Sequence, residues 1–159
     1  LDDLDSLDNV VVLRTFSKLY GLAGLRLGYG IMPAWLAELL HRVKLPFSVN
    51  MLAETAGIAA LQDDHFVQAS RDTIISGRKI LFNGFRRMGW DVFPSQANFL
   101  LIKPSFPARM LVEELLTRGY IVRGLTSYGL SEHVRITVGT EEENRGLLHA
   151  CSQIHAAYA

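Results

Sequence analysis

The sequence predicts an α/β protein in which the end of a parallel-sheet domain is followed by a long helix and a smaller α+β domain. Three observations support this fold class. A β-branched run at residues 10–13 leads into a glycine-rich turn and a second apolar run. Strand and helix patterns then alternate, and a long helical stripe separates the two parts. We predict a domain boundary that divides the chain into residues 1–62 and 63–159.

The first part contains two predicted strands and two predicted helices. Residues 10–13 are typical of a strand buried on both faces of a parallel sheet, and residues 27–32 form a second strand. Pro33 suits the first turn of a helix that ends at residues 44–46. Its apolar positions share one face and are Leu36, Leu39, Leu40 and Val43. Residues 50–61 are predicted to form the next helix.

The second part opens with the long helix, which Asp63 and Asp64 are expected to cap and Gly89 to close. Beyond it the pattern predicts four strands and one further helix before the last one. The strands are expected at residues 90–93, 98–102, 120–123 and 134–138, and the helix at 107–118. Thr140 and Glu143 form a capping box that opens the last helix.

Composition narrows the classes of partner. Sixteen basic residues balance sixteen acidic ones, so no overall field draws the chain to nucleic acid or to a membrane surface, and small molecules are the expected ligands. No apolar run is long enough for a membrane span. The single cysteine, Cys151, cannot form an internal disulfide, which fits a cytoplasmic protein. The chain opens on an acidic stretch without Met, as a fragment would.

One short segment concentrates reactive and anion-binding groups. Residues 14–30 read RTFSKLYGLAGLRLGYG, in which Lys18 follows Thr15 and Ser17 and precedes Arg26. A lysine held at a strand end in a partly dry site becomes a useful nucleophile, and an arginine fork suits a phosphate dianion. The glycines let the backbone approach a ligand closely. These groups describe a lysine beside a phosphate site, although a solvated turn lysine and a surface arginine fit the same letters equally well.

Other motifs are excluded or weak. The glycines follow the lysine, whereas a Walker loop needs them before it, and the spacing of a dinucleotide fingerprint is absent. Cys151 and His155 lie four residues apart on the last predicted helix, but two ligands without a third are more often core and surface residues. We therefore predict no metal site.

The lysine segment resembles that of the fold type I pyridoxal-phosphate aminotransferases of classes I and II, where a Ser/Thr-x-Ser-Lys stretch precedes an arginine at this distance. Within that family it is most similar to the histidinol-phosphate aminotransferases. A second similar segment, residues 119–144, reads GYIVRGLTSYGLSEHVRITVGTEEEN. The two segments occur in the family's order. The resemblance covers nearly the whole chain but only about the C-terminal half of such an enzyme.

The resemblance implies a role for each matched residue. Lys18 would hold pyridoxal 5'-phosphate covalently and move the proton on the substrate carbon, while Thr15, Ser17 and Arg26 would bind the cofactor phosphate. The matched substrate-binding residues are Arg135, for the substrate α-carboxylate, and Arg123, near the phosphate end of the substrate. Independently, the alternation in HVRITVG turns Arg135 away from the core, as it would a solvated strand arginine. Asn98, in SQANFLL, is left out of the predicted site.

The implied reaction is transamination between histidinol phosphate and 2-oxoglutarate in histidine biosynthesis, by a cytoplasmic homodimer. Because the family's pyridine-binding carboxylate and much of its phosphate cup lie upstream of the matched region, the isolated chain is expected to be inactive. Three alternatives stay open: a threonine-phosphate decarboxylase, another class I or II aminotransferase, and a truncated interaction module without a cofactor.

Overall fold

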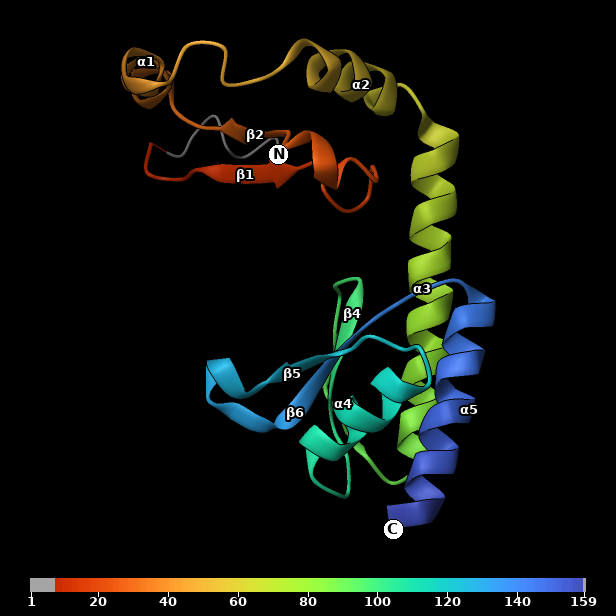
Figure 1. The fold of residues 1–159 in the computed structure, drawn as a ribbon. Helices are drawn as coiled ribbons and strands as arrows, with labels where there is room; N and C mark the ends of the chain where they lie inside the picture. The colour runs from red at the N-terminus through yellow and green to blue at the C-terminus, as the bar shows by residue number, and fades with distance from the viewer. Residues whose placement is uncertain (1–7, 159) are drawn as a thin grey trace. The chain divides into compact units, whose positions relative to one another are not determined.

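The computed structural model describes residues 8–158, which form two compact units that divide between Ser70 and Arg71 (Figure 1). The division falls within α3 (Asp64–Arg87). The domain boundary at residues 62 and 63 stays a prediction. Among the described helices, none combines the length and the apolar character that crossing a membrane requires.

Unit 1 is a hairpin followed by two helices. Strands β1 (Val12–Thr15) and β2 (Gly28–Ile31) pair antiparallel, with a 3-10 turn, η2 (Ala23–Leu25), in their connection. Helices α1 (Ala34–Val43) and α2 (Met51–Leu61) follow. The side chain of Asn50 accepts a hydrogen bond from the Ala53 amide at 2.9 Å, which caps α2. Both strands and both helices predicted for this part of the chain are present.

The first strand differs from its prediction in burial. It begins at Val12, and Leu13 is 75% exposed, so the expectation of a strand buried on both faces is wrong for this chain. In the described residues β1 has one neighbour, the antiparallel strand β2. A two-stranded ribbon has no further layer against which its faces can pack, which explains the exposure.

Unit 2 is a four-stranded antiparallel sheet with helices packed on one face. The strands lie in the order β3-β4-β6-β5. Their bounds are β3 (Asp91–Val92), β4 (Phe99–Lys103), β5 (Arg123–Leu125) and β6 (Leu130–Thr137). The 3-10 turn η3 (Thr126–Tyr128) joins β5 to β6, and the remaining helices are α4 (Ala108–Thr117) and α5 (Glu141–Tyr158). Figure 1 shows α5 running beside α3.

Alternation along the strands sorts the two faces of this sheet. Leu100 and Ile102 of β4 and Val134 and Ile136 of β6 are buried in one core with side chains of α3, α4 and α5. The intervening residues, among them Arg135, are only half-buried because they face away from this core. The core thus fixes which strand residues reach the outer face.

Two helices end with the same glycine motif. Gly89 after α3 and Gly119 after α4 have φ angles of +75° and +83°. After α4 the Tyr120 amide donates to the Leu115 carbonyl at 2.9 Å, as in a Schellman cap. The strand predicted at residues 120–123 is wrong in its extent, because the Tyr120 amide serves this cap and β5 begins at Arg123.

The capping box at the start of α5 is confirmed. The Thr140 amide donates to the Glu143 carboxylate at 2.7 Å, and the Glu143 amide donates to the Thr140 hydroxyl at 3.3 Å. The hydrogen bond from the Thr140 backbone is the main reason why the pKa of Glu143 lies below its ordinary value. Each of the two side chains therefore accepts a hydrogen bond from a backbone amide that has no partner within the helix.

A close contact joins α3 to the corner between β6 and α5. Asn144, 1% exposed, is the buried polar side chain of the described residues, and its amide group bonds both backbone groups of Gly139, at 3.0 and 2.9 Å. A Cβ placed on Gly77 of α3 would lie 2.5 Å from Asn144 Nδ2 and 2.6 Å from Val138 Cγ1. The corner therefore packs on the helix backbone itself.

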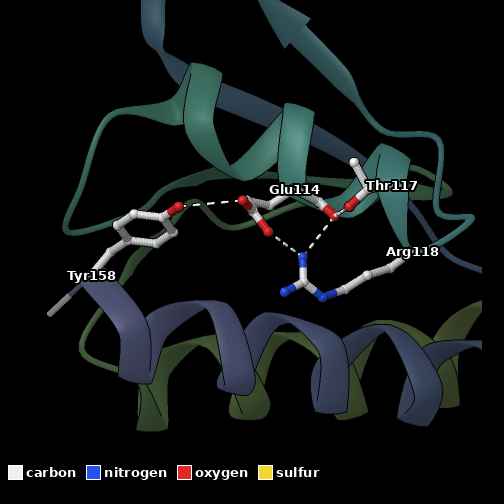
Figure 2. A network of polar contacts seen from close by, with 4 residues as sticks. All are labelled: Glu114, Thr117, Arg118 and Tyr158. Carbon is white, nitrogen blue, oxygen red and sulfur yellow. Dashed lines mark hydrogen bonds and ion pairs between the residues drawn. The ribbon is translucent and has the colours of Figure 1, made fainter.

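A second polar network ties α4 to the end of α5 (Figure 2). The Tyr158 hydroxyl donates to Glu114 Oε1 at 3.2 Å, and Arg118 both pairs with the Glu114 carboxylate and donates to the Glu114 carbonyl at 2.8 Å. The hydrogen bond from Arg118 is the main cause of the lowered pKa of Glu114, whose charge in turn raises the pKa of Tyr158.

The Gly77 contact predicts an unusual response to alanine. Gly77→Ala should lower the free energy of unfolding by about 2 kcal/mol, because overpacking against Asn144 and Val138 outweighs the gain of about 1 kcal/mol in helix propensity. Urea unfolding of the chain measures it. Gly84→Ala is the control, since its Cβ would meet the movable end of the Leu148 side chain and should cost less. Equal stability of the two variants would contradict this account.

The Glu114 network predicts an acid-sensitive contribution to stability. Because its folded-state pKa is lowered, the contribution of Glu114 is complete above the ordinary value of 4.5 and is lost as pH falls through the folded-state pKa. The stability difference between wild type and Glu114→Gln should therefore close in acid, as urea titrations across pH would show. Tyr158→Phe, which keeps the Arg118 pair, should retain most of the acid dependence; a pH-independent difference for Glu114→Gln would contradict the assignment.

Candidate active site

The Lys18 turn is closed by its own backbone. The Phe16 amide donates to the Leu27 carbonyl at 3.1 Å, and the Leu22 amide donates back to the Phe16 carbonyl at 3.0 Å. Within this loop the Gly21 amide donates to the Lys18 carbonyl at 2.9 Å, and Gly21 has φ +69°. A left-handed residue at that position favours glycine, so the sequence after the lysine builds the turn that displays it.

Phe16 anchors this turn in unit 1. It is 4% exposed, and its ring lies 4.8 Å from that of Tyr20 and 6.0 Å from that of Tyr29. A Cβ added at Gly57 of α2 would lie 3.8 Å from the Phe16 ring and 2.4 Å from the Leu27 side chain. The close approach of α2 therefore buries Phe16, while Lys18 is exposed.

The predicted cofactor-binding residues lie at the end of β1 and in its connection to β2. The Thr15 hydroxyl accepts a hydrogen bond from the Ser17 amide at 3.0 Å. Arg26 Nη1 donates to the Ala23 carbonyl at 2.6 Å, and Arg26 has φ +57°. The described residues leave Lys18 exposed, so they do not form the partly dry site in which a lysine becomes a useful nucleophile.

The two predicted substrate-binding arginines face each other across neighbouring strands of unit 2. Arg123 of β5 is the register partner of Arg135 of β6, and Leu101 of β4 lies opposite Arg135 on its other side. The expectation that Arg135 points away from the core is confirmed, because Val134 and Ile136 on either side of it are buried. The structure thus brings Lys18 and its neighbours together in unit 1, and the two arginines together in unit 2.

Each arginine lies over an aromatic ring. Arg135 Cζ is 5.3 Å from the centroid of Phe99, and Arg123 Cζ is 5.5 Å from that of Tyr128, whose hydroxyl accepts a bond from Arg123 Nη2 at 3.3 Å. Neither contact was predicted from the sequence. The alternation of residues along β4 could have placed Phe99 on the same sheet face as Arg135, whereas Tyr128 lies in a turn, where no such pattern indicates its position.

The weak metal candidate has other contacts. Cys151 is fully buried, and burial raises the pKa of its thiol to about 12. His155 Nδ1 accepts a hydrogen bond from Trp90 Nε1 at 3.3 Å. Both side chains therefore belong to the packing of α5.

Comparison with known proteins assigns the family. The chain matches the family described as aminotransferase class I and II over residues 1–151. It belongs to this family. Among curated relatives it is similar to the histidinol-phosphate aminotransferase of Nitratidesulfovibrio vulgaris, with 52% identity over 154 residues, which are 97% of this chain and 41% of that protein. The chain thus spans less than half of that relative's length.

Solved structures agree with the family and confirm the fold class. The histidinol-phosphate aminotransferase of Sinorhizobium meliloti, solved in complex with pyridoxal-5'-phosphate, has a TM-score of 0.86 and 28% identity over 97% of this chain and 44% of that one. L-threonine-O-3-phosphate decarboxylase of Porphyromonas gingivalis has a TM-score of 0.82 and 25% identity over 96% of this chain and 49% of that one. The chain has the fold of part of a fold type I aminotransferase.

The left-handed backbone of Arg26 predicts that glycine would be more stable than arginine at this position. Arg26→Gly should raise the local stability of the turn by about 1 kcal/mol, because a non-glycine residue is strained there. Slower hydrogen exchange at the Phe16 and Leu22 amides, which close the turn, would show this. Arg14→Gly in β1 is the control and should speed exchange, since glycine weakens a strand interior; faster exchange in Arg26→Gly would contradict the account.

Proposed function

We propose that this chain is the C-terminal part of a pyridoxal-phosphate-dependent aminotransferase that exchanges an amino group between histidinol phosphate and 2-oxoglutarate, giving imidazole acetol phosphate and glutamate. The observation that carries the proposal is the displayed Lys18 turn, with Thr15 at the end of β1 and Ser17 and Arg26 in the connection to β2, in a chain of this family. Similarity to histidinol-phosphate aminotransferases supports the substrate. A cytoplasmic homodimer is part of the same proposal.

The residues of the turn fit the cofactor. Among the described contacts, none engages the Lys18 amine or the Ser17 hydroxyl, and the Thr15 hydroxyl is already oriented by the Ser17 amide. Arg26 keeps a strained backbone, which is typical of residues held for function. When bound, the cofactor supplies an electron sink for the substrate carbon. Lys18 would hold it covalently and then move the proton at that carbon, while Thr15, Ser17 and Arg26 bind its phosphate.

The arginine pair fits the two anionic substrates. Glutamate carries a carboxylate on the carbon that bears the amine, whereas histidinol phosphate carries a phosphorylated methylene there. Arg135 would take the carboxylate as a bidentate fork. Arg123, its cross-strand partner, would add the second cation that a phosphate dianion needs. Two facing arginines without a described carboxylate partner cost stability, which an anionic ligand would repay.

Threonine-phosphate decarboxylation is the second candidate, because a decarboxylase of that substrate shares the fold and threonine phosphate also has two anionic ends. Release of carbon dioxide separates it from transamination. A non-catalytic interaction module is the third. It would use the exposed apolar side chains of unit 1, among them Leu45, Phe47 and Met51, and would bind no cofactor.

The cofactor assignment predicts a lysine-dependent visible absorbance. To supply the family's upstream residues, residues 1–159 are joined to the preceding part of the Nitratidesulfovibrio vulgaris enzyme. This chimera with pyridoxal phosphate should show a visible band that Lys18→Ala abolishes, and borohydride reduction should add the cofactor mass to the peptide containing Lys18. Lys44→Ala, an exposed lysine after α1, is the control and should keep the band. A band that survives Lys18→Ala would refute the assignment.

The reaction itself is tested on the same chimera. Incubation with histidinol phosphate and 2-oxoglutarate should produce glutamate, and Lys18→Ala should lower the rate by at least about 10²-fold, as loss of a general acid-base group does. Carbon dioxide released from threonine phosphate, with no glutamate formed, would favour the decarboxylase. A colourless chimera that folds and self-associates would favour the interaction module.

A further inference from the structure

We propose that Phe99 and Tyr128 are positioning residues for the substrate-binding arginines: each ring attracts the guanidinium that lies over it and leaves N–H groups of that arginine free for an anion. This inference rests on the proposed function, in which Arg135 and Arg123 bind the anionic ends of the substrates. The positioning role of the two rings is argued from the ring contacts and the strand register.

The strand register places two arginines next to each other, and their contacts with the aromatic rings offset the resulting repulsion. Arg123 and Arg135 are direct cross-strand partners, and like charges at such positions repel. Among the described residues, neither forms an ion pair with a carboxylate. Instead Arg135 lies over Phe99 of the neighbouring strand β4, and Arg123 lies over Tyr128 of η3, the turn that joins β5 to β6. The aromatic contacts thus draw the two cations toward different elements.

A ring and a carboxylate hold an arginine in opposite ways. A carboxylate takes two in-plane N–H groups and neutralises the charge, which are the features that an anionic substrate would use. An aromatic ring attracts the flat face of the guanidinium and uses none of its five donors. Stacking therefore orients Arg135 without competing with a ligand. Arg123 gives up one donor, to the Tyr128 hydroxyl, and keeps the rest.

Phe99 sits on a firmly held backbone. The Ser95 hydroxyl accepts a bond from the Ala97 amide at 3.0 Å and donates to the Phe99 carbonyl at 2.7 Å. Arg78 Nη1 of α3 donates to the Ala97 carbonyl at 3.0 Å. On the other side the Val138 amide donates to the Asn98 carbonyl at 2.9 Å. These bonds fix the segment from both flanks, so Phe99 gives Arg135 a rigid platform.

Tyr128 is held less firmly than Phe99. It lies in the three-residue turn η3, is 63% exposed and precedes Gly129, whose φ is +74°. The Arg123 side chain can therefore shift with this turn more readily than Arg135 of β6 can shift against Phe99 of β4. The difference matches the two half-reactions, since every substrate brings an anionic group for Arg135, whereas only histidinol phosphate brings a doubly charged phosphate group, which we expect to engage Arg123 as well.

Steady-state kinetics of the chimera test the proposal. Phe99→Leu should raise the KM for both histidinol phosphate and 2-oxoglutarate about 3- to 10-fold with kcat unchanged, and Phe99→Tyr, which keeps a ring, should restore both. Tyr128→Leu should raise the KM for histidinol phosphate alone. Phe93→Leu is the matched control. Phe93 is an exposed aromatic residue whose ring contacts His133, and no arginine among the described contacts.

Three results would overturn the inference: KM changes no larger in Phe99→Leu than in Phe93→Leu, failure of Phe99→Tyr to restore KM, or a fall in kcat at unchanged KM. If the wild-type chimera forms no glutamate, the proposed function fails by itself. The platforms are then tested in the 159-residue chain by following the Arg135 Nε–H resonance during titration with inorganic phosphate. A shift that weakens in Phe99→Leu and persists in Phe99→Tyr supports them, and a response unaffected by either change refutes them.

Discussion

The arrangement of unit 2 depends on one close contact made at a glycine, which has no side chain to keep the two segments apart. Gly77 lets the backbone of α3 touch the corner between β6 and α5, and Asn144 fills that corner while bonding both backbone groups of Gly139. A buried side-chain amide without these hydrogen bonds would lower the stability of the fold. The hydrogen bonds, and not packing alone, therefore determine the geometry of the corner. The end of β6 is thereby fixed relative to the long helix.

This constraint reaches the arginine pair through strand β6. Once Val138 is held at the corner, alternation along β6 puts Val134 and Ile136 into the core and turns Arg135 to the outer face. A shift of one residue would bury the guanidinium among α3, α4 and α5. The same register sets Leu101 and Arg123 on either side of Arg135. Packing on one face of the sheet therefore decides what the other face presents.

Local patterns predicted the elements well, because the signals are contained in a few neighbouring residues. The glycine after α4 and the capping box of α5 each describe a hydrogen-bonding arrangement that the residues complete themselves. Pairing across strands has no such local signal. The facing of Arg123 and Arg135 depends on register, and β5 starts late because the Tyr120 amide is already used by the helix cap. The burial expected for residues 10–13 required neighbouring strands that β1 does not have here.

The Lys18 turn of unit 1 and the arginine pair of unit 2 differ in how far this chain supports them. Unit 2 closes a core around its sheet, and the arginine pair rests on that core. In unit 1 the described buried hydrophobic side chains are Phe16 and Ala53, while Phe47 is 99% exposed. The lysine turn is thus shaped by its own hydrogen bonds and one aromatic anchor, and further protein surface must cover it before Lys18 has a dry environment. In the proposed function, the substrate-binding arginines are the part of the site that this chain supports most completely, whereas the proposed reactivity of Lys18 depends on what packs against unit 1.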